Sequence, residues 1–276
     1  MGINAELVSL VARMRSDSIL LGDTVIEIGA QDVCVAPEVI CQIAAKYILE
    51  KSKADIVNAK ELYALLGFAN YKCIDASGGN DALLMDLNKD IREEYGFFES
   101  YDLVTNLGTA EHCFNQFTVF KNLHDICKRG GVMVHALPAQ GNVNHGFYNY
   151  HPRFFLDLAV ANGYEILDLS FTVDYKSTLI KYTKAEFQNW DSHDILFYAV
   201  FRKVNDAPFC TPFDGMFAKI NKVAGYLTGD VDPLKTEFSP YLKGGNWENT
   251  KGYANQSPQR SSYLKMFSRR LKSIFY

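Results

Sequence analysis

The segment TVIEIGAQD, residues 24–32, constrains the fold of this chain more than any other part of the sequence. Its apolar run of Val25, Ile26 and Ile28 carries one acidic residue, Glu27, and ends at Gly29. An apolar run bounded by glycine predicts a buried parallel strand that ends in a tight turn. In open α/β sheets ligands bind at such a turn, because glycine lets the backbone approach a ligand closely.

Strand and helix patterns alternate along the following residues. Further strands are expected at 71–74, 82–87, 101–107, 132–137, 164–171 and 195–202, with Pro138 breaking the strand that precedes it. Helices are expected at 6–14, from Pro37 onwards, and at 54–66, 117–128 and 152–162. This order predicts an α/β fold with a doubly wound, mostly parallel seven-stranded sheet that has helices on both faces.

The chain divides into three parts by composition. Residues 1–22 are expected to form an N-terminal helical cap, residues 23–204 a Rossmann-like domain, and residues 205–276 a C-terminal appendage rich in proline and glycine. With 276 residues, 48% of them hydrophobic, the chain can build one large core. No stretch approaches the ~20 apolar residues of a membrane span.

The net charge and the cysteines indicate which partners and which cellular compartment to expect. The net charge of −4 provides no overall field that attracts nucleic acid, which is therefore not expected as a partner. The six cysteines form no C-x-x-C pair, which favours reduced thiols. We expect a cytoplasmic protein.

Candidate site residues follow the ends of the predicted strands, because ligands in such sheets bind beyond the carboxyl ends of the strands. Four of these segments, in this order, resemble the motifs of the class I S-adenosylmethionine-dependent methyltransferases, over residues 24–202. They are VIEIGAQD, KCIDASG, MDLN, and DLVTNLGTAEH with the later KRGG and VMVHALP. The first differs from the family pattern, since Ala30, Gln31 and Asp32 follow Gly29 where further glycine is usual.

The resemblance implies a Rossmann-like fold and S-adenosyl-L-methionine as the cofactor. It places the first motif at the methionine and ribose portions, Asp75 at the ribose hydroxyls, and Asp86 near the adenine. The cofactor-binding residues expected on this basis are Glu27, Gly29, Gln31, Asp32, Asp75, Asp86, Leu87 and Asn106.

Histidines and aromatic residues follow the later strands. A neutral imidazole suits removal of a proton from a hydroxyl or amine, so we predict His112 and His145 as catalytic residues. Glu111, Tyr148 and His151 are predicted to bind the substrate. The alternative for each histidine and for Glu111 is a loop residue exposed to water.

Other kinds of site are not expected. His124, at helical spacing from Phe120 and Cys127, is expected to be a packed or a surface histidine, and His135, inside a strand, is expected to be structural. The segment GAQDVC lacks the second and third glycines of a dinucleotide-binding turn. No metal site is predicted, because the histidines and cysteines share no ligand spacing.

These observations favour a methyltransferase acting on a small-molecule or glycan acceptor at oxygen. The segment 106–109 does not resemble the Asp/Asn-Pro-Pro-aromatic motif of enzymes that methylate amino groups of nucleic acids. The alternative is a catalytically inactive methyltransferase-like protein kept for binding or assembly, which the irregular first motif favours.

Residues 261–276 predict a basic amphipathic helix. One helical stripe is apolar, with Leu264, Phe267, Leu271 and either Ile274 or Phe275. The cations lie largely elsewhere on the helix, at Lys265, Arg269, Arg270 and Lys272. Such a helix can rest on an anionic membrane or dock on a partner. The alternative is packing on this protein itself or within an oligomer.

Overall fold

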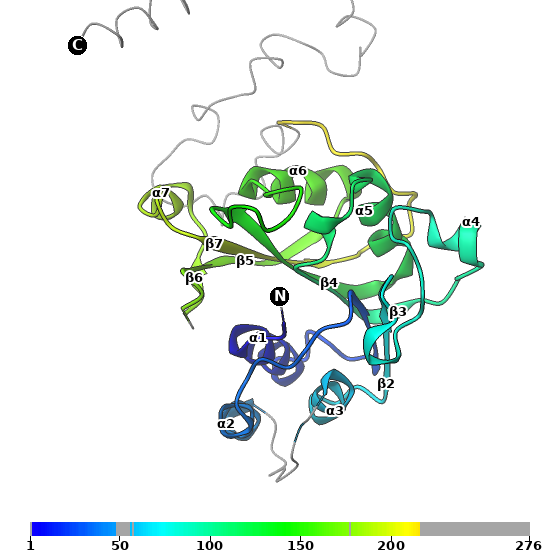
Figure 1. Ribbon diagram of the computed structural model, residues 1–276, viewed down its shortest axis with the longest axis horizontal. Helices are drawn as coiled ribbons and strands as arrows, with labels where there is room; N and C mark the ends of the chain where they lie inside the picture. Colours follow the sequence, from blue (N-terminus) through cyan, green and yellow to red (C-terminus); the bar gives the residue numbers. More distant parts are fainter. Residues whose placement is uncertain (1, 48–55, 57, 177, 216–276) are drawn as a thin grey trace, which may run out of the picture. The chain divides into compact units, whose positions relative to one another are not determined.

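The computed structural model describes residues 2–47, 56, 58–176 and 178–215 (Figure 1). A seven-stranded mixed sheet runs through them in the order β2-β1-β3-β4-β7-β5-β6. The strands are β1 (Thr24–Ile28), β2 (Asn70–Ile74), β3 (Tyr101–Leu107), β4 (Cys127–Gln140), β5 (Glu165–Val173), β6 (Ile180–Lys181) and β7 (Ile195–Arg202). Strands β1 to β5 share one direction and β6 and β7 oppose it, so the predicted α/β fold with a mostly parallel sheet is confirmed.

Helices cover both faces of the sheet (Figure 1). On one face lie α1 (Ala5–Ser16), α2 (Pro37–Tyr47) and α3 (Ala59–Leu65), and on the other α5 (Gln116–Ile126) and α6 (Pro152–Asn162). Two shorter helices are α4 (Ile91–Tyr95) and α7 (Lys184–Gln188), and two 3-10 turns are η1 (Gly79–Asp81) and η2 (Ala110–His112). The chain therefore winds to opposite sides of the sheet, as the sequence predicted.

Strict alternation of side chains divides the core into two apolar clusters. Along β7, Phe197 and Phe201 pack with α5 and α6, while Tyr198 and Val200 pack with α1 to α3. Successive residues of a strand point to opposite faces, so a strand covered on both sides is apolar at nearly every position. Burial of each large side chain contributes about 1.5–3 kcal/mol.

The N-terminal helix α1 packs on the sheet by its apolar face. Asn4 caps it, because its side chain accepts a hydrogen bond from the Leu7 backbone N–H at 3.0 Å. The same side chain donates to the Tyr198 hydroxyl at 2.6 Å, which ties the start of the helix to β7. Leu7, Leu10 and Met14 are buried in the cluster below the sheet.

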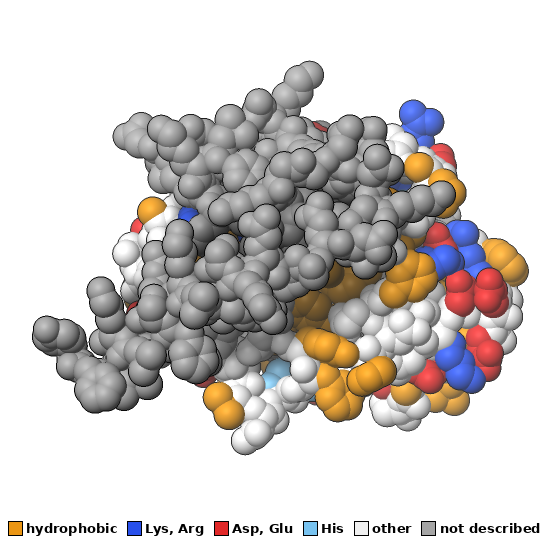
Figure 2. Space-filling model, turned by 90° about the horizontal axis from the view of Figure 1, so that it is seen from above, with side chains coloured by type: hydrophobic (Ala, Val, Ile, Leu, Met, Phe, Trp, Pro, Cys, Tyr) orange, Lys and Arg blue, Asp and Glu red, His pale blue; other side chains and the backbone are white. Residues whose placement is uncertain are grey.

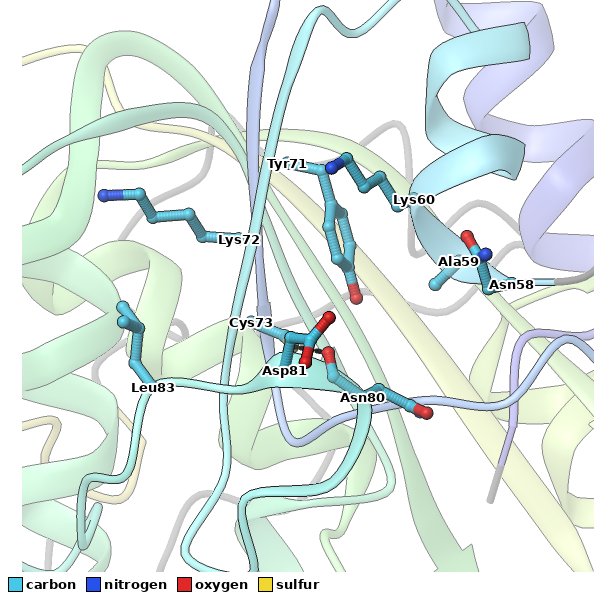
Figure 3. Close-up of a pocket in the computed structure, with 9 residues that line it drawn as sticks. All are labelled: Asn58, Ala59, Lys60, Tyr71, Lys72, Cys73, Asn80, Asp81 and Leu83. Atoms are coloured by element: carbon cyan, nitrogen blue, oxygen red, sulfur yellow. Dashed lines mark hydrogen bonds between the residues drawn. The ribbon is translucent and has the colours of Figure 1, made fainter.

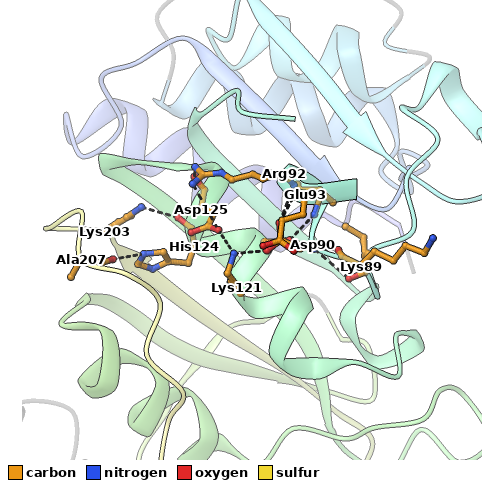
Figure 4. A network of polar contacts seen from close by, with 12 residues as sticks. Lys89, Asp90, Arg92, Glu93, Lys121, His124, Asp125, Lys203 and Ala207 are labelled. Carbon is orange, nitrogen blue, oxygen red and sulfur yellow. Dashed lines mark hydrogen bonds and ion pairs between the residues drawn. The ribbon is translucent and has the colours of Figure 1, made fainter. Parts of the chain in front are cut away.

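Ion pairs and hydrogen bonds join α4, α5 and the segment after β7 (Figure 4). The Lys121 ammonium lies 2.6 Å from Asp90 and 2.7 Å from Asp125. His124 contacts the Tyr164 hydroxyl through Nδ1 at 2.6 Å and the Ala207 carbonyl through Nε2 at 2.9 Å. Of the two expectations for His124, that of a packed histidine is confirmed.

Residues 205–215, the described part of the predicted appendage, contact α6. The Cys210 N–H donates to the Asn162 side chain at 2.8 Å, and the Gly215 N–H donates to Asp157 at 2.9 Å. The predicted amphipathic helix at 261–276 lies outside the described residues. Within the described ranges, no helix is both long and apolar enough to cross a membrane.

One strand prediction was wrong, and one strand was not predicted. Residues 82–87 form a single bridge, Leu83 to Ile74, because the chain turns away at once and Asp86 accepts the Asn88 N–H in a local turn. The seventh strand is instead β6, which the sequence analysis missed.

Pro138 does not end its strand, since β4 continues to Gln140. The ladder with β3 stops at Ala136, so beyond it β4 pairs only with β7, where Pro138 lies opposite Leu196. A proline is tolerated where a strand has a partner on one side only.

The predicted helix over 54–66 starts later than expected. Asn58 caps α3 by accepting the Glu61 N–H at 2.9 Å, so the helix begins at Ala59. Residues 54, 55 and 57 lie outside the described ranges.

Candidate functional site

A cavity of about 400 Å³ opens at the carboxyl ends of β1, β2 and β3. The segments that follow these strands form its wall: Gly29, Ala30, Gln31, Ile74, Asp75, Ala76, Met85, Asp86, Leu87, Asn88, Gly108, Thr109, His112 and Cys113. Its volume suits a small organic ligand. Of the residues predicted from sequence, the cavity brings together Gly29, Gln31, Asp75, Asp86, Leu87 and His112.

Gly29 forms the floor of the turn after β1. Its φ of +84° is strained for other residues, and a Cβ built there would lie 2.2 Å from the Thr109 hydroxyl oxygen. Its N–H donates to the Ile74 carbonyl at 2.7 Å. Glycine at this position therefore lets the ends of all three strands approach one another.

Gln31 carries an acceptor without a partner. Its Nε2 donates to the Gly29 carbonyl at 3.3 Å and to the Thr109 hydroxyl at 3.4 Å. Its Oε1 is buried and has no hydrogen-bond partner in the part of the chain that the structure describes. Gln31 lines the cavity, and because an unpaired buried acceptor is costly, a ligand donor that reached Oε1 would offset this cost.

The two carboxylates of the wall are held ionised by their own loops. Asp75 accepts from the Ala30 N–H at 3.0 Å, and from the N–H and hydroxyl of Ser77 at 2.7 and 2.6 Å. Although burial acts to raise it, these bonds hold the pKa of Asp75 below its usual value. Bonds from the backbone and side chain of Asn88 likewise lower the pKa of Asp86.

Glu27 lies behind the cavity, on the face of the sheet that α3 covers. Its two carboxylate oxygens accept hydrogen bonds from the Tyr63 and Tyr71 hydroxyls at 2.9 and 2.8 Å. The side chain is fully buried, and this burial raises the pKa of Glu27 to about 7. Its predicted contact with a cofactor stays a prediction, and its position indicates support for the turn after β1.

Asn106 and Asp32 also lie outside the cavity wall. The Asn106 side chain accepts from the Ala110 N–H at 3.1 Å and lies 3.3 Å from His135 Nδ1, so it holds the turn η2 against the end of β3. His135 is buried, as expected for a structural histidine. The Asp32 side chain is exposed, and its carbonyl accepts the Ile3 N–H at 2.8 Å.

The predicted acceptor-side residues Glu111, His112 and His145 lie together. His145 Nε2 is 3.4 Å from Glu111 Oε1, His112 Nε2 is 3.9 Å from the same oxygen, and the two imidazole rings are 4.9 Å apart. Glu111 is fully buried, and burial raises its pKa to about 7. Spacing along the chain did not reveal this grouping, because His145 arrives from the loop after β4 and the other two from η2 after β3.

Tyr148 and His151 are the remaining predicted substrate residues. The Tyr148 hydroxyl donates to the Phe114 carbonyl at 3.1 Å, which joins the loop after β4 to the segment after η2. His151 is exposed at the N-cap of α6. Their role in substrate binding stays a prediction.

Several functional positions escaped the sequence analysis. Thr109, Met85 and Cys113 line the cavity, and of these Thr109 could have been found from the close approach that Gly29 implies. Tyr63 and Tyr71 carry no sequence signal, because their shared partner Glu27 is brought to them only by packing of α3 on the sheet.

Exposed apolar side chains lie beside the acceptor-side residues. Phe114 and Phe147 are 75% and 68% exposed, and their rings meet edge to face with centroids 6.4 Å apart. Figure 2 shows a face on which hydrophobic side chains gather at the surface near a histidine. Exposed rings near a site are suited to contact with a ligand.

A second cavity, of about 430 Å³, lies on the outer side of β2 against α3 (Figure 3). Its wall includes Asn58, Lys60, Tyr71, Lys72, Asn80 and Asp81. It is slightly larger than the first but lies along the sheet edge rather than at the carboxyl ends of the strands. We assign the functional site to the first cavity, since open α/β sheets bind ligands at those ends.

No protein-family model matches the sequence, and no curated protein matches it significantly. Solved structures similar to the chain include methyltransferases. The O-methyltransferase of a trans-AT polyketide synthase multienzyme of Brevibacillus brevis, in complex with S-adenosyl-L-homocysteine, is 13% identical with a TM-score of 0.37, over 72% of this chain and 71% of that one. The 1,6-didemethyltoxoflavin-N1-methyltransferase of Burkholderia thailandensis is 12% identical with a TM-score of 0.37, over 71% and 79%.

A candidate RNA methyltransferase of Pyrococcus horikoshii is also similar, at 12% identity and a TM-score of 0.37, over 72% of this chain and 84% of that one. The likeness to all three is one of α/β fold. Identities and TM-scores this low say nothing of the cofactor, the acceptor or the activity of this chain.

Proposed function

We propose that this chain is an S-adenosylmethionine-dependent methyltransferase that methylates an oxygen of a small-molecule or glycan acceptor. The observation that carries the proposal is the cavity at the carboxyl ends of β1, β2 and β3. An unpaired buried acceptor, an ionised carboxylate and an apolar wall meet there, at the positions that the motif resemblance assigns to the cofactor.

The residues of the cavity wall fit the parts of this cofactor. Gln31 Oε1 would accept a hydrogen bond from the amino group of the methionine portion. A carboxylate offers about four acceptor positions, and the loop bonds of Asp75 use three, so one remains for a ribose hydroxyl. Asp86 and Leu87 would contact the adenine, the latter by apolar contact.

The bound cofactor supplies an electrophilic methyl group on a sulfonium, so the protein needs mainly to align the acceptor oxygen with it. His112 lines the cavity, and the His145 imidazole lies next to that of His112, near the same oxygen of Glu111. Burial, with the neighbouring His145, lowers the pKa of His112, so its imidazole is neutral at pH 7. These two residues are placed to manage the proton that the acceptor loses.

The rings of Phe114 and Phe147 support an acceptor with a flat apolar face. Aromatic side chains stack on aromatic rings and on the apolar faces of sugars, at little cost in side-chain freedom. Both rings are exposed beside the histidines, which leaves them free to contact such a group.

Calorimetry with S-adenosylhomocysteine tests the proposal. Wild-type protein should bind one molecule per chain, Asp75→Ala should abolish binding, and Gln31→Met should weaken it about tenfold by removing one hydrogen bond to a charged group. Asp191→Asn, at an exposed aspartate of another surface, is the matched control and should bind as wild type. Absence of binding to wild-type protein at millimolar ligand would refute the proposal.

A catalytically inactive binding protein is the second candidate. The side chain of Gln31 lies where the family pattern has glycine, and it folds back on Gly29 and Thr109. Cofactor binding without turnover on a panel of hydroxylated acceptors would favour this alternative, whereas transfer of a radiolabelled methyl group to any of them would exclude it.

A further inference from the structure

Three potential metal ligands converge from two loops. Glu111 and His112 come from η2 after β3, and His145 comes from the loop after β4. One ligand atom of each lies within 4.8 Å of the other two. The carboxyl ends of the neighbouring parallel strands β3 and β4 are at the same edge of the sheet, which brings the two loops together.

Glu111 is a buried carboxylate that the fold leaves unpaired. Its side chain is 0% exposed, and neither carboxylate oxygen has a hydrogen-bond partner among the described residues. Buried charges in proteins are paired or coordinate metals, because an isolated carboxylate is costly to bury. Among the described residues, the only groups within ion-pair distance of Glu111 are the imidazoles of His112 and His145.

The loop that carries His145 is fitted closely to Glu111. The Phe147 N–H donates to the Glu111 carbonyl at 2.8 Å, and a Cβ at Gly146 would lie 3.0 Å from Glu111 Cγ. The loop is fixed further by Asn142, whose side chain accepts from the Tyr175 hydroxyl and whose N–H donates to Asp194 at 2.9 Å. His145 is thus held beside the carboxylate by the backbone of its own loop.

We propose that Glu111, His112 and His145 bind a divalent transition-metal ion of the zinc class at the edge of the cavity. Zinc takes two histidines and a carboxylate at about 2.0–2.2 Å, which sets tetrahedral ligand atoms roughly 3.4 Å apart. The separation of 3.4 Å between His145 Nε2 and Glu111 Oε1 already meets this. His112 Nε2 lies 3.9 Å from the same oxygen, and the three ligand atoms lie within 4.8 Å of one another, so the imidazoles would have to approach each other when the ion binds.

The choice of metal follows from the ligand set. Imidazole and carboxylate together suit zinc, manganese, iron and cobalt, whereas magnesium and calcium prefer oxygen ligands. Three protein ligands leave at least one coordination position open, as in catalytic rather than structural zinc sites.

The open coordination position would hold the hydroxyl of the acceptor. This part of the inference rests on the proposed methyltransferase function. His112 also lines the cavity, so an ion held by it lies next to the space assigned to the cofactor. An acceptor hydroxyl bound to a divalent ion loses its proton to water near neutral pH. Its oxygen then bonds to the methyl carbon as the carbon–sulfur bond breaks and the electron pair stays on sulfur. The two histidines would then act on the acceptor's proton through the ion that they hold, and the acceptor would carry a hydroxyl.

Calorimetry on the full chain, stripped with chelator and titrated with zinc chloride alone, tests the site. One ion per chain should bind wild-type protein, and Glu111→Gln and His145→Ala should each raise the Kd on the order of 100-fold. His193→Ala is the matched control, because His193 also pairs with a carboxylate, Asp174 at 2.9 Å, but is neither a proposed ligand nor part of the cavity wall. Equal zinc binding by wild type and His145→Ala would overturn the proposal.

Cobalt(II) spectroscopy separates this site from binding by the six free cysteines. Cobalt bound by two histidines and a carboxylate gives visible ligand-field bands that His145→Ala removes. A thiolate-to-cobalt charge-transfer band at one equivalent would place the ion on a cysteine and overturn the proposal. His145 is an exposed loop residue, so its alanine variant should fold even where Glu111→Gln does not.

Binding of S-adenosylhomocysteine to wild-type protein, with and without zinc, distinguishes the two proposals. Zinc binding that depends on His145, without binding of S-adenosylhomocysteine, would refute the methyltransferase function and leave the metal site standing. Binding of S-adenosylhomocysteine together with zinc binding that is indifferent to His145 would refute the metal site alone.

Discussion

Replacing Glu27 with glutamine should make the protein more stable at alkaline pH. The carboxylate is fully buried, and its two contacts, the Tyr63 and Tyr71 hydroxyls, are neutral donors. Burial raises the pKa of Glu27 to about 7 from an ordinary value of 4.5. Because the folded state then binds the proton more tightly than the unfolded state, this group's contribution to stability is complete below pH 4.5 and is lost as the pH rises through 7.

The size of the effect follows from the shift in pKa. A difference of about 2.5 units between folded and unfolded states, at 1.36 kcal/mol per unit, gives about 3 kcal/mol. Glutamine has the same shape, can accept from one tyrosine hydroxyl and donate to the other, and does not titrate. Glu27→Gln should therefore exceed the wild-type free energy of unfolding by about 1 kcal/mol at pH 5 and by about 3 kcal/mol at pH 9.

Urea unfolding of wild type and Glu27→Gln between pH 5 and pH 9 measures the difference between their free energies of unfolding. The titrations of all other groups cancel in this difference, because both proteins share them. Glu99→Gln is the control, since Glu99 also accepts from a tyrosine hydroxyl, that of Tyr101 at 2.7 Å, but is exposed. Bonds from Lys72 and Tyr101 lower the pKa of Glu99, so its variant should show no rise over this range. A flat difference for Glu27→Gln would refute the argument from burial.

Three further predictions concern the turn after β1, the buried histidine and the metal. Gly29→Ala should cost about 1–3 kcal/mol in urea unfolding and abolish binding of S-adenosylhomocysteine, because the residue has positive φ and its Cβ would meet Thr109; wild-type affinity would contradict this. Burial lowers the pKa of His135 to about 3, so its contribution to stability is present above pH 6.5 and is lost as the pH falls. The free energy of unfolding of His135→Gln should therefore rise by about 3 kcal/mol relative to that of wild type as the pH falls from 7 to 4, measured by urea unfolding. A difference that does not change with pH would contradict the argument from burial. Zinc at 100 times its Kd should stabilise wild type by about 2.7 kcal/mol, measured as a rise in Tm that His145→Ala lacks and His193→Ala keeps.

The sequence predicted the central strands of the sheet better than the strands at its edges. The nearly continuous apolar run 195–202 predicted β7, and the apolar residues within 101–107 predicted β3, because both faces of those strands are covered. The short edge strand β6 escaped, since two residues carry no pattern, and the expected strand at 82–87 failed because Asp86 makes a local turn instead. Local hydrogen bonds, invisible in hydrophobic periodicity, decide such edges.

The sequence predicted those residues of the candidate site that directly follow the end of a strand. Gly29, Gln31, Asp75, Asp86 and Leu87 were found in this way, and all line the cavity. What the sequence could not provide is the partner of each group. The tyrosines that surround Glu27, and the approach of His145 to Glu111, depend on loops that meet only after the sheet has formed.

The unequal lengths of β3 and β4 have a consequence for how the size of the candidate site can change. The ladder between them stops at Ala136, and β4 runs four residues further, about 13 Å at ~3.3 Å per residue, before its loop turns back to Glu111. Adding or deleting two residues in this overhang would move the loop by roughly 7 Å while each side chain kept its face. A lineage of such chains could thus resize the side of the site that holds Glu111 and His145 by strand length alone and leave the turn at Gly29 untouched.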